Sequence, residues 1–146
     1  MTLFKGFTGA FEELILDHIF ADTDLVMPAD SLYVGLGSGT LTEEVGSGLY
    51  GATEIATGDY ARVAVALTDG WTVSASATIN WQVVNAADIT FAECSAGYTI
   101  TNVLIFDNTL ASGTSRLITA APLASTGISI GQTVKILAGT LKLGLT

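Results

Sequence analysis

The chain has 146 residues, of which 49% are hydrophobic and only 13% are charged, and its formal net charge is −9 at pH 7. This length suits a single domain, residues 1–146, with one hydrophobic core. An ordinary soluble domain contains about 25% charged residues, so charge is scarce here. The acidic excess repels phosphate and argues against direct nucleic-acid binding.

Signals for export or membrane insertion are not found in the sequence. No run of about 18 apolar residues is present, and the first residues lack the apolar stretch and cleavage site of a signal peptide. Cys94 is the only cysteine, so no intramolecular disulfide can form and the fold must rest on packing. We therefore expect a protein made in the cytoplasm, with no membrane partner.

The charged residues are unevenly distributed along the chain. Residues 70–146 contain only Asp88, Glu93, Asp107, Arg116, Lys135 and Lys142. A monomer needs a charged surface to stay soluble and unassociated. We therefore expect that neighbouring copies or another partner cover part of the C-terminal half.

The first predicted element is an amphipathic helix over about residues 8–20. Apolar side chains recur there at i, i+3, i+4 and i+8, and His18 stands at i+7 on the same face. Thr8 can cap the helix, and two glutamates near its start suit the helix dipole. The face consists of Phe11, Leu14, Ile15, His18 and Ile19.

A loop over 22–30 and a strand over 31–36 follow the helix. Residues 37–59 are rich in Gly, Ser, Thr and Glu and show little periodicity, which predicts a long Gly-rich loop that projects as an arm. The β core is expected over 60–146, where apolar and polar residues alternate or form short apolar runs between turn residues. These runs are 60–67, 79–83, 89–91, 99–106, 115–121 and 133–143. About eight short strands predict a mainly β fold, a single-domain sandwich or barrel.

Several residue patterns resemble functional motifs without completing them. The run from Gly35 to Thr40 resembles the start of a dinucleotide fingerprint, but Thr40 stands where the third Gly belongs and no helical pattern follows. Glycine at a strand exit explains the run equally well. Asp22, Asp24 and Asp30 could gather Ca²⁺, yet Val26 and Met27 occupy the ligand and Gly positions that an EF-hand requires.

Catalytic pairs are equally incomplete. His18 lies on the apolar helical face, where a lone histidine is normally packed, and Cys94 has no recognisable catalytic context. The adjacent pairs Glu12-Glu13 and Glu43-Glu44 are expected to be solvated. The side chains of adjacent residues point apart, whereas the carboxylates of a glycosidase converge on the sugar. We therefore predict no enzyme, no catalytic residue, no cofactor and no metal site.

Aromatic residues offer one candidate for carbohydrate binding. Trp81 alternates in step with Ile79 and Val83, which predicts a core position. Trp71, beside the Asp69-Gly70 turn, is the free candidate. A carbohydrate-binding module would need a groove lined by Trp71 and a tyrosine.

The order of motifs resembles a family of tailed-bacteriophage virion structural proteins, the head-decoration and tail-fibre-like proteins. The resemblance covers nearly the whole chain in short pieces, although residues 37–59 are longer than is usual for the family. The motifs are 16–20 (LDHIF), 32–36 (LYVGL), 58–63 (GDYARV), Trp71, 87–91 (ADITF), 103–107 (VLIFD) and 131–134 (GQTV). This resemblance implies a structural subunit without cofactors, and no functional residue is carried over from the family.

Our leading hypothesis from the sequence is a capsid decoration, or cement, protein of the virion. Such a protein binds the major capsid protein and copies of itself, here expected as a trimer, and stabilises the assembled shell by mass action. The alternative is a tail or tail-fibre component that contacts tail proteins. The second alternative, from another class, is a carbohydrate-binding module.

Overall fold

The computed structural model describes residues 4–5, 7, 9–22, 24, 30–41, 53–75, 81–107 and 117–144. Within these residues the fold is mainly β with a single helix near the N-terminus, as the sequence predicts. The described elements are β1 (Phe4–Lys5), α1 (Gly9–Phe20), β2 (Ser31–Ser38), β3 (Thr53–Glu54), β4 (Val63–Ala66), β5 (Trp71–Ala75), β6 (Trp81–Asn85), β7 (Ile89–Thr90), β8 (Tyr98–Phe106), β9 (Leu117–Ile128), β10 (Lys135–Ile136) and β11 (Lys142–Gly144).

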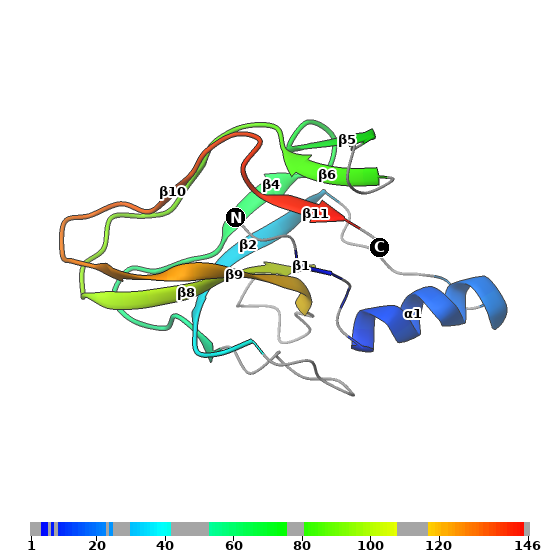
Figure 1. Cartoon of the computed structure of the whole chain (residues 1–146), viewed down its shortest axis with the longest axis horizontal. Helices are drawn as coiled ribbons and strands as arrows, with labels where there is room; N and C mark the ends of the chain where they lie inside the picture. Colours follow the sequence, from blue (N-terminus) through cyan, green and yellow to red (C-terminus); the bar gives the residue numbers. More distant parts are fainter. Residues whose placement is uncertain are drawn as a thin grey trace.

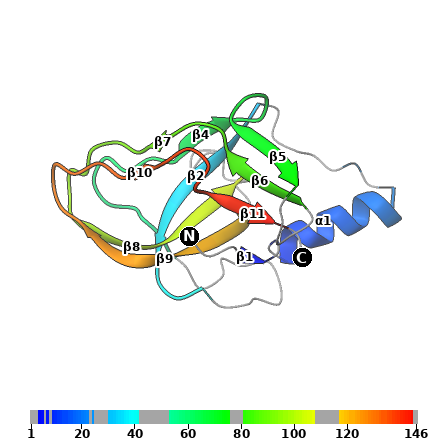
Figure 2. The same ribbon diagram turned by 45° about the horizontal axis from the view of Figure 1, so that its top comes forward.

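Two larger sheets form the layers of the molecule. One has the strand order β1-β11-β6-β5, and the other has the order β3-β2-β8-β9, with β4 also paired to β2. A short third sheet pairs β10 with β7. Figures 1 and 2 show the first sheet stacked over the second, with α1 projecting from one end of the sandwich.

The hydrophobic core lies between these layers and is built from alternate residues of the central strands. Val34 and Leu36 of β2 and Val103 of β8 have no exposed surface. The neighbouring Leu104 and Phe106 of β8 point to the opposite face and are buried in a second, smaller cluster. Because both of its faces are covered, β8 is the central strand of the fold.

The helix begins and ends close to its predicted limits. It covers Gly9–Phe20, and the proposed cap Thr8 lies outside the described residues. The chain leaves the helix through Asp22, which has a φ of 54°. Aspartate tolerates this left-handed conformation better than most residues, and a residue in this conformation commonly ends a helix.

The segment 37–59 is not a loop throughout, which corrects the prediction. β2 continues to Ser38, and its last two residues pair antiparallel with Thr53 and Glu54 of β3. Ile55 then donates a backbone hydrogen bond to Leu36 O (3.0 Å) and is buried. The expected projecting arm would fall on 42–52, which lie outside the described residues.

The run 133–143 forms two short strands instead of one. The buried Asn85 side chain donates to the carbonyls of Ala87 and Leu137 and accepts from the N–H of Leu141, all at 2.9 Å. Gly139, with a φ of 71°, completes a turn at this point and donates to Asn85 O (2.8 Å). The turn sends β10 to one sheet and β11 to another.

Other strands differ in extent from their predictions. β9 runs twelve residues, to Ile128, well beyond the predicted limit of 121. β5 was not predicted at all, because Trp71 was placed beside the Asp69-Gly70 turn and no strand was assigned after it. Residues 79–80 and 115–116 of two predicted strands lie outside the described residues.

Candidate functional site

A buried polar cluster lies beside β2. The Tyr60 hydroxyl accepts a hydrogen bond from the Leu36 N–H (2.8 Å) and donates one to Glu54 Oε1 (2.9 Å). Arg62 forms a bidentate ion pair with the same carboxylate, through Nε to Oε1 (2.8 Å) and Nη2 to Oε2 (2.7 Å). The Arg62 and Glu54 side chains are 6% and 13% exposed, so the pair is largely shielded from water.

Aromatic rings enclose this cluster. The guanidinium carbon of Arg62 lies 3.4 Å from the centre of the Phe106 ring, and the Tyr60 ring stacks on Phe91. Burial is the main cause that raises the pKa of Tyr60, so its hydroxyl stays protonated and keeps donating to Glu54. Removing one member of such a buried pair costs about 3–5 kcal/mol, because the other charge remains buried. The cluster therefore links β2, β3 and the segment before β4 inside the molecule.

The glycines that resembled a nucleotide-binding motif have packing roles. Gly35 and Gly37 lie inside β2, not at its exit. A Cβ on Gly35 would come within 2.8 Å of Tyr60 Oη, and one on Gly37 within 3.1 Å of Leu104. Only Gly39, with a φ of 101°, lies at the strand exit. Close packing against the polar cluster explains Gly35 better than the strand exit that we expected.

The candidate metal and catalytic residues are not brought together. Within the described ranges, no group of three or more His, Cys, Asp or Glu side chains is placed to hold a metal ion. Asp22, Asp24 and Asp30 are all exposed. Cys94 is buried and its Sγ donates to Ala96 O (3.1 Å). His18 is exposed on α1, which corrects the expectation that it packs against the core.

The remaining carboxylate pairs fall in two categories. Glu12 and Glu13 are exposed on α1, as predicted for a solvated pair. Glu43 and Glu44 lie outside the described residues.

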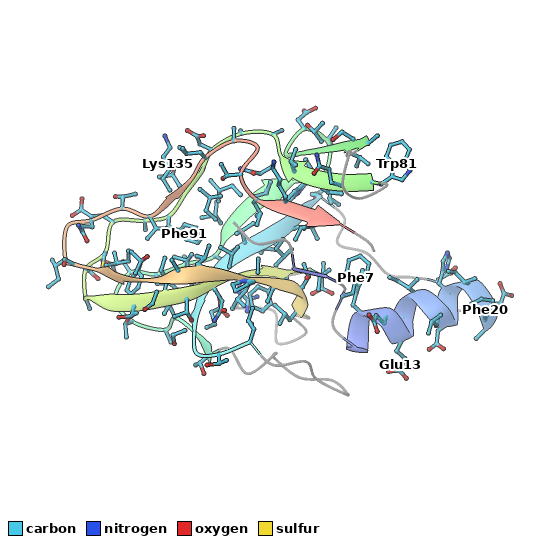
Figure 3. The ribbon with its side chains drawn as sticks, viewed as in Figure 1. Phe7, Glu13, Phe20, Trp81, Phe91 and Lys135 are labelled. Carbon is cyan, nitrogen blue, oxygen red and sulfur yellow. The ribbon has the colours of Figure 1, made fainter. Side chains whose placement is uncertain are left out.

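The two tryptophans exchange the roles that the sequence suggested. Trp71 packs against the core, and its buried indole Nε1 has no hydrogen-bond acceptor among the described residues. Trp81 is 63% exposed, although its strand face was predicted correctly. It shares that face with the buried Asn85, but it stands at the far end of β6, where the sheet extends beyond the layer below (Figure 3). The candidate carbohydrate anchor is therefore a core residue.

Trp81 belongs to an exposed apolar area that we call the strand patch. β5 and β6 pair in register, with Val73 opposite Val83 and Ala75 opposite Trp81, so these side chains lie on one face. Val73 is 64% exposed. The strand patch consists of Val73 and Trp81, with the exposed Ala75 beside them.

A second apolar area lies on the distal half of α1, and we call it the helix patch. Phe11 is buried, and Leu14 and Ile15 are half-buried against the core. Ile19 was predicted on this packed face but is exposed. The helix patch consists of Leu16, Ile19 and Phe20, which are 55%, 61% and 81% exposed. Figure 3 shows Phe20 at the tip of the helix, at the same end of the molecule as Trp81.

The described residues also include no helix long and apolar enough to cross a bilayer. A small β sandwich with exposed apolar patches, formed by residues that are poor in charge, is the class of protein that this structure defines. Such surfaces are typical of subunits that pack against other chains.

Comparison with known families agrees with this class. The family model described as "Podophage GP4 fiber I protein gp80" matches residues 6–144, and the chain belongs to this family. No curated protein matches the chain. The resemblance to tailed-phage virion structural proteins is thereby confirmed, and the chain is a structural component of a phage virion.

Proposed function

We propose that this protein is a fibre subunit of a tailed phage and that its role is mechanical. The observation that carries the proposal is the family match, which extends over residues 6–144 and whose description is that of a fibre protein. It supports the tail-fibre alternative over the capsid decoration that we first preferred. The subunit then contacts copies of itself and other tail proteins, and it needs no cofactor and runs no reaction.

The structure offers physical support for a mechanical role. The central strand β8 is covered on both faces, and the Glu54–Arg62 pair ties β3 to the segment before β4. Breaking a buried pair of this kind is strongly destabilising, because one charge is left buried without a partner. The apolar patches supply surface for contacts outside this rigid body.

The test is to locate the subunit in the purified particle by cryo-electron microscopy. We expect density that fits this fold on fibres attached to the tail. A particle from a phage that lacks the gene serves as the control, and the same density must disappear from it. Density at regular lattice sites on the head shell would contradict the fibre proposal and restore the decoration hypothesis.

A further inference from the structure

The helix patch and the strand patch differ in the charges on their elements. Helix α1 contains Glu12, Glu13 and Asp17 and no Lys or Arg. The four strands β1, β11, β6 and β5 contain Lys5 and Lys142 and no carboxylate. Lys142 pairs with Val84, on the face of the sheet opposite the strand patch, so the strand patch itself is uncharged. The acidic helix therefore meets no like charge there, and like charges across an interface would oppose association.

The helix patch and the strand patch also belong to two kinds of surface, a helix stripe and a sheet face, that pack on each other in proteins. Leu16, Ile19 and Phe20 follow the i, i+3, i+4 spacing, so they form one ridge along the projecting part of the helix. The strand patch is the core-facing side of β5 and β6, continued past the point where the sandwich covers it. An apolar helical ridge is the usual covering of such a sheet face.

The exposed area is large enough for a specific contact. A fully buried aromatic side chain removes 150–250 Å² from water, so Phe20 and Trp81, at 81% and 63% exposure, offer roughly 300 Å² together. Leu16, Ile19 and Val73 bring the apolar total to roughly 600 Å². Since apolar atoms make up about 60% of a typical interface, such a contact buries about 1,000 Å², the lower limit for a specific interface.

We propose that the helix patch of one copy docks on the strand patch of a second copy of this chain. The inference deepens the fibre proposal and rests on it, because it names the contact through which subunits join. In this contact Phe20 lies against Trp81 and Val73 of the neighbour. A helix with three carboxylates and no Lys or Arg does not suit a lipid surface, which selects basic amphipathic helices.

The first measurement is the mass of the 146-residue chain in solution by light scattering and sedimentation. We expect an oligomer whose mass falls on dilution. Phe20→Ser and Trp81→Ser remove one anchor each from exposed positions, so circular dichroism should stay unchanged. Each substitution should weaken self-association at least about thirty-fold, the effect typical of a central anchor residue.

A mixing experiment tests which surface meets which. The Phe20→Ser variant retains an intact strand patch, and the Trp81→Ser variant retains an intact helix patch. Each variant alone should be monomeric, and an equimolar mixture should form a dimer with one copy of each. The matched control is Ile130→Ser, because Ile130 is 72% exposed but lies in neither patch. This control should associate like the wild type.

Three results would overturn the inference. They are a wild-type chain that stays monomeric at its highest soluble concentration, a Trp81→Ser variant that associates normally, and a mixture that forms no paired species. These results leave the fibre proposal intact if microscopy still places the subunit on the tail. Conversely, correct mixing behaviour with density only on the head would retain the contact and remove the fibre assignment.

Discussion

Gly35 lies in the middle of β2, where no side chain can be accommodated. A Cβ at this position would come within 2.8 Å of Tyr60 Oη, 3.0 Å of Phe106 Cε2 and 3.1 Å of Glu54 Oε1. Two of these atoms belong to the polar cluster, whose hydrogen bonds hold them in place. Glycine at this position therefore allows the cluster to approach the strand.

We predict that Gly35→Ala destabilises the protein by about 1–3 kcal/mol, the usual cost of overpacking a tight site. The measurement is urea unfolding followed by circular dichroism. Gly127→Ala is the control, because Gly127 also lies in a strand but a Cβ there meets nothing within 4 Å. The control should unfold within about 0.5 kcal/mol of the wild type. Equal unfolding midpoints for the two variants would contradict the packing argument.

The exchanged roles of Trp71 and Trp81 show what residue alternation can reveal. The alternation of Trp81 with Val83 correctly indicated the core-facing side of β6. It could not indicate whether the opposite sheet extends as far as Trp81, because that depends on the lengths of strands remote in the sequence. A single residue beside a turn, such as Trp71, carries no period and gave no signal.

At the scale of elements, the helix and most strands could be predicted, because 3.6-residue and two-residue periods are local properties. The division of 133–143 into β10 and β11 could not, because it depends on Asn85, about 50 residues away in the chain. The same limit applies to α1. The period placed Ile19 on the packed face, but it does not say how far along the helix the rest of the chain extends.

The β10–β11 turn has a second anchor in Asp88. Its Oδ2 lies 2.7 Å from Nζ of Lys135, which is labelled in Figure 3. Its Oδ1 accepts a hydrogen bond from the Ala138 N–H at 2.8 Å. The hydrogen bond from Lys135 is the largest cause that lowers the pKa of Asp88, and the Ala138 N–H adds to it. A lowered pKa means that the ionised form stabilises the fold. That stabilisation is complete above the unfolded value of about 3.9 and is lost as the pH falls through the folded pKa.

We predict that Lys135→Met raises the pKa of Asp88 toward its ordinary value. The measurement is an NMR titration of the Asp88 carboxyl carbon in the wild type and the variant at acidic pH. Lys142→Met is the matched control, because it removes an exposed lysine that lies on β11 and forms no contact with Asp88. The control should leave the Asp88 titration unchanged. An unshifted midpoint in Lys135→Met would show that the Ala138 N–H alone sets it.

On the scale of the whole molecule, the chain divides into a body, the β sandwich, and a projecting helix, α1. The body holds the described core and the buried Glu54–Arg62 pair. The distal half of α1 projects from it (Figure 1), and its apolar side chains are exposed. Composition had indicated an incompletely covered surface in residues 70–146. The structure places part of it on β5 and β6, and it adds a second part on α1, in the acidic half of the chain.

This division predicts how amide hydrogen exchange depends on protein concentration. Residues 16–20 of α1 are all exposed, so their amides should exchange fast in dilute protein, whereas those of β8 should be protected at every concentration. If the helix patch docks on a second copy, protection of 16–20 rises with concentration, because docking removes local opening of the helix end. Hydrogen-exchange mass spectrometry follows both peptides in one experiment, with β8 as the internal reference. The Trp81→Ser variant should abolish the rise without changing β8. Protection of 16–20 that is already complete in dilute protein would show that the helix end is stabilised within its own chain.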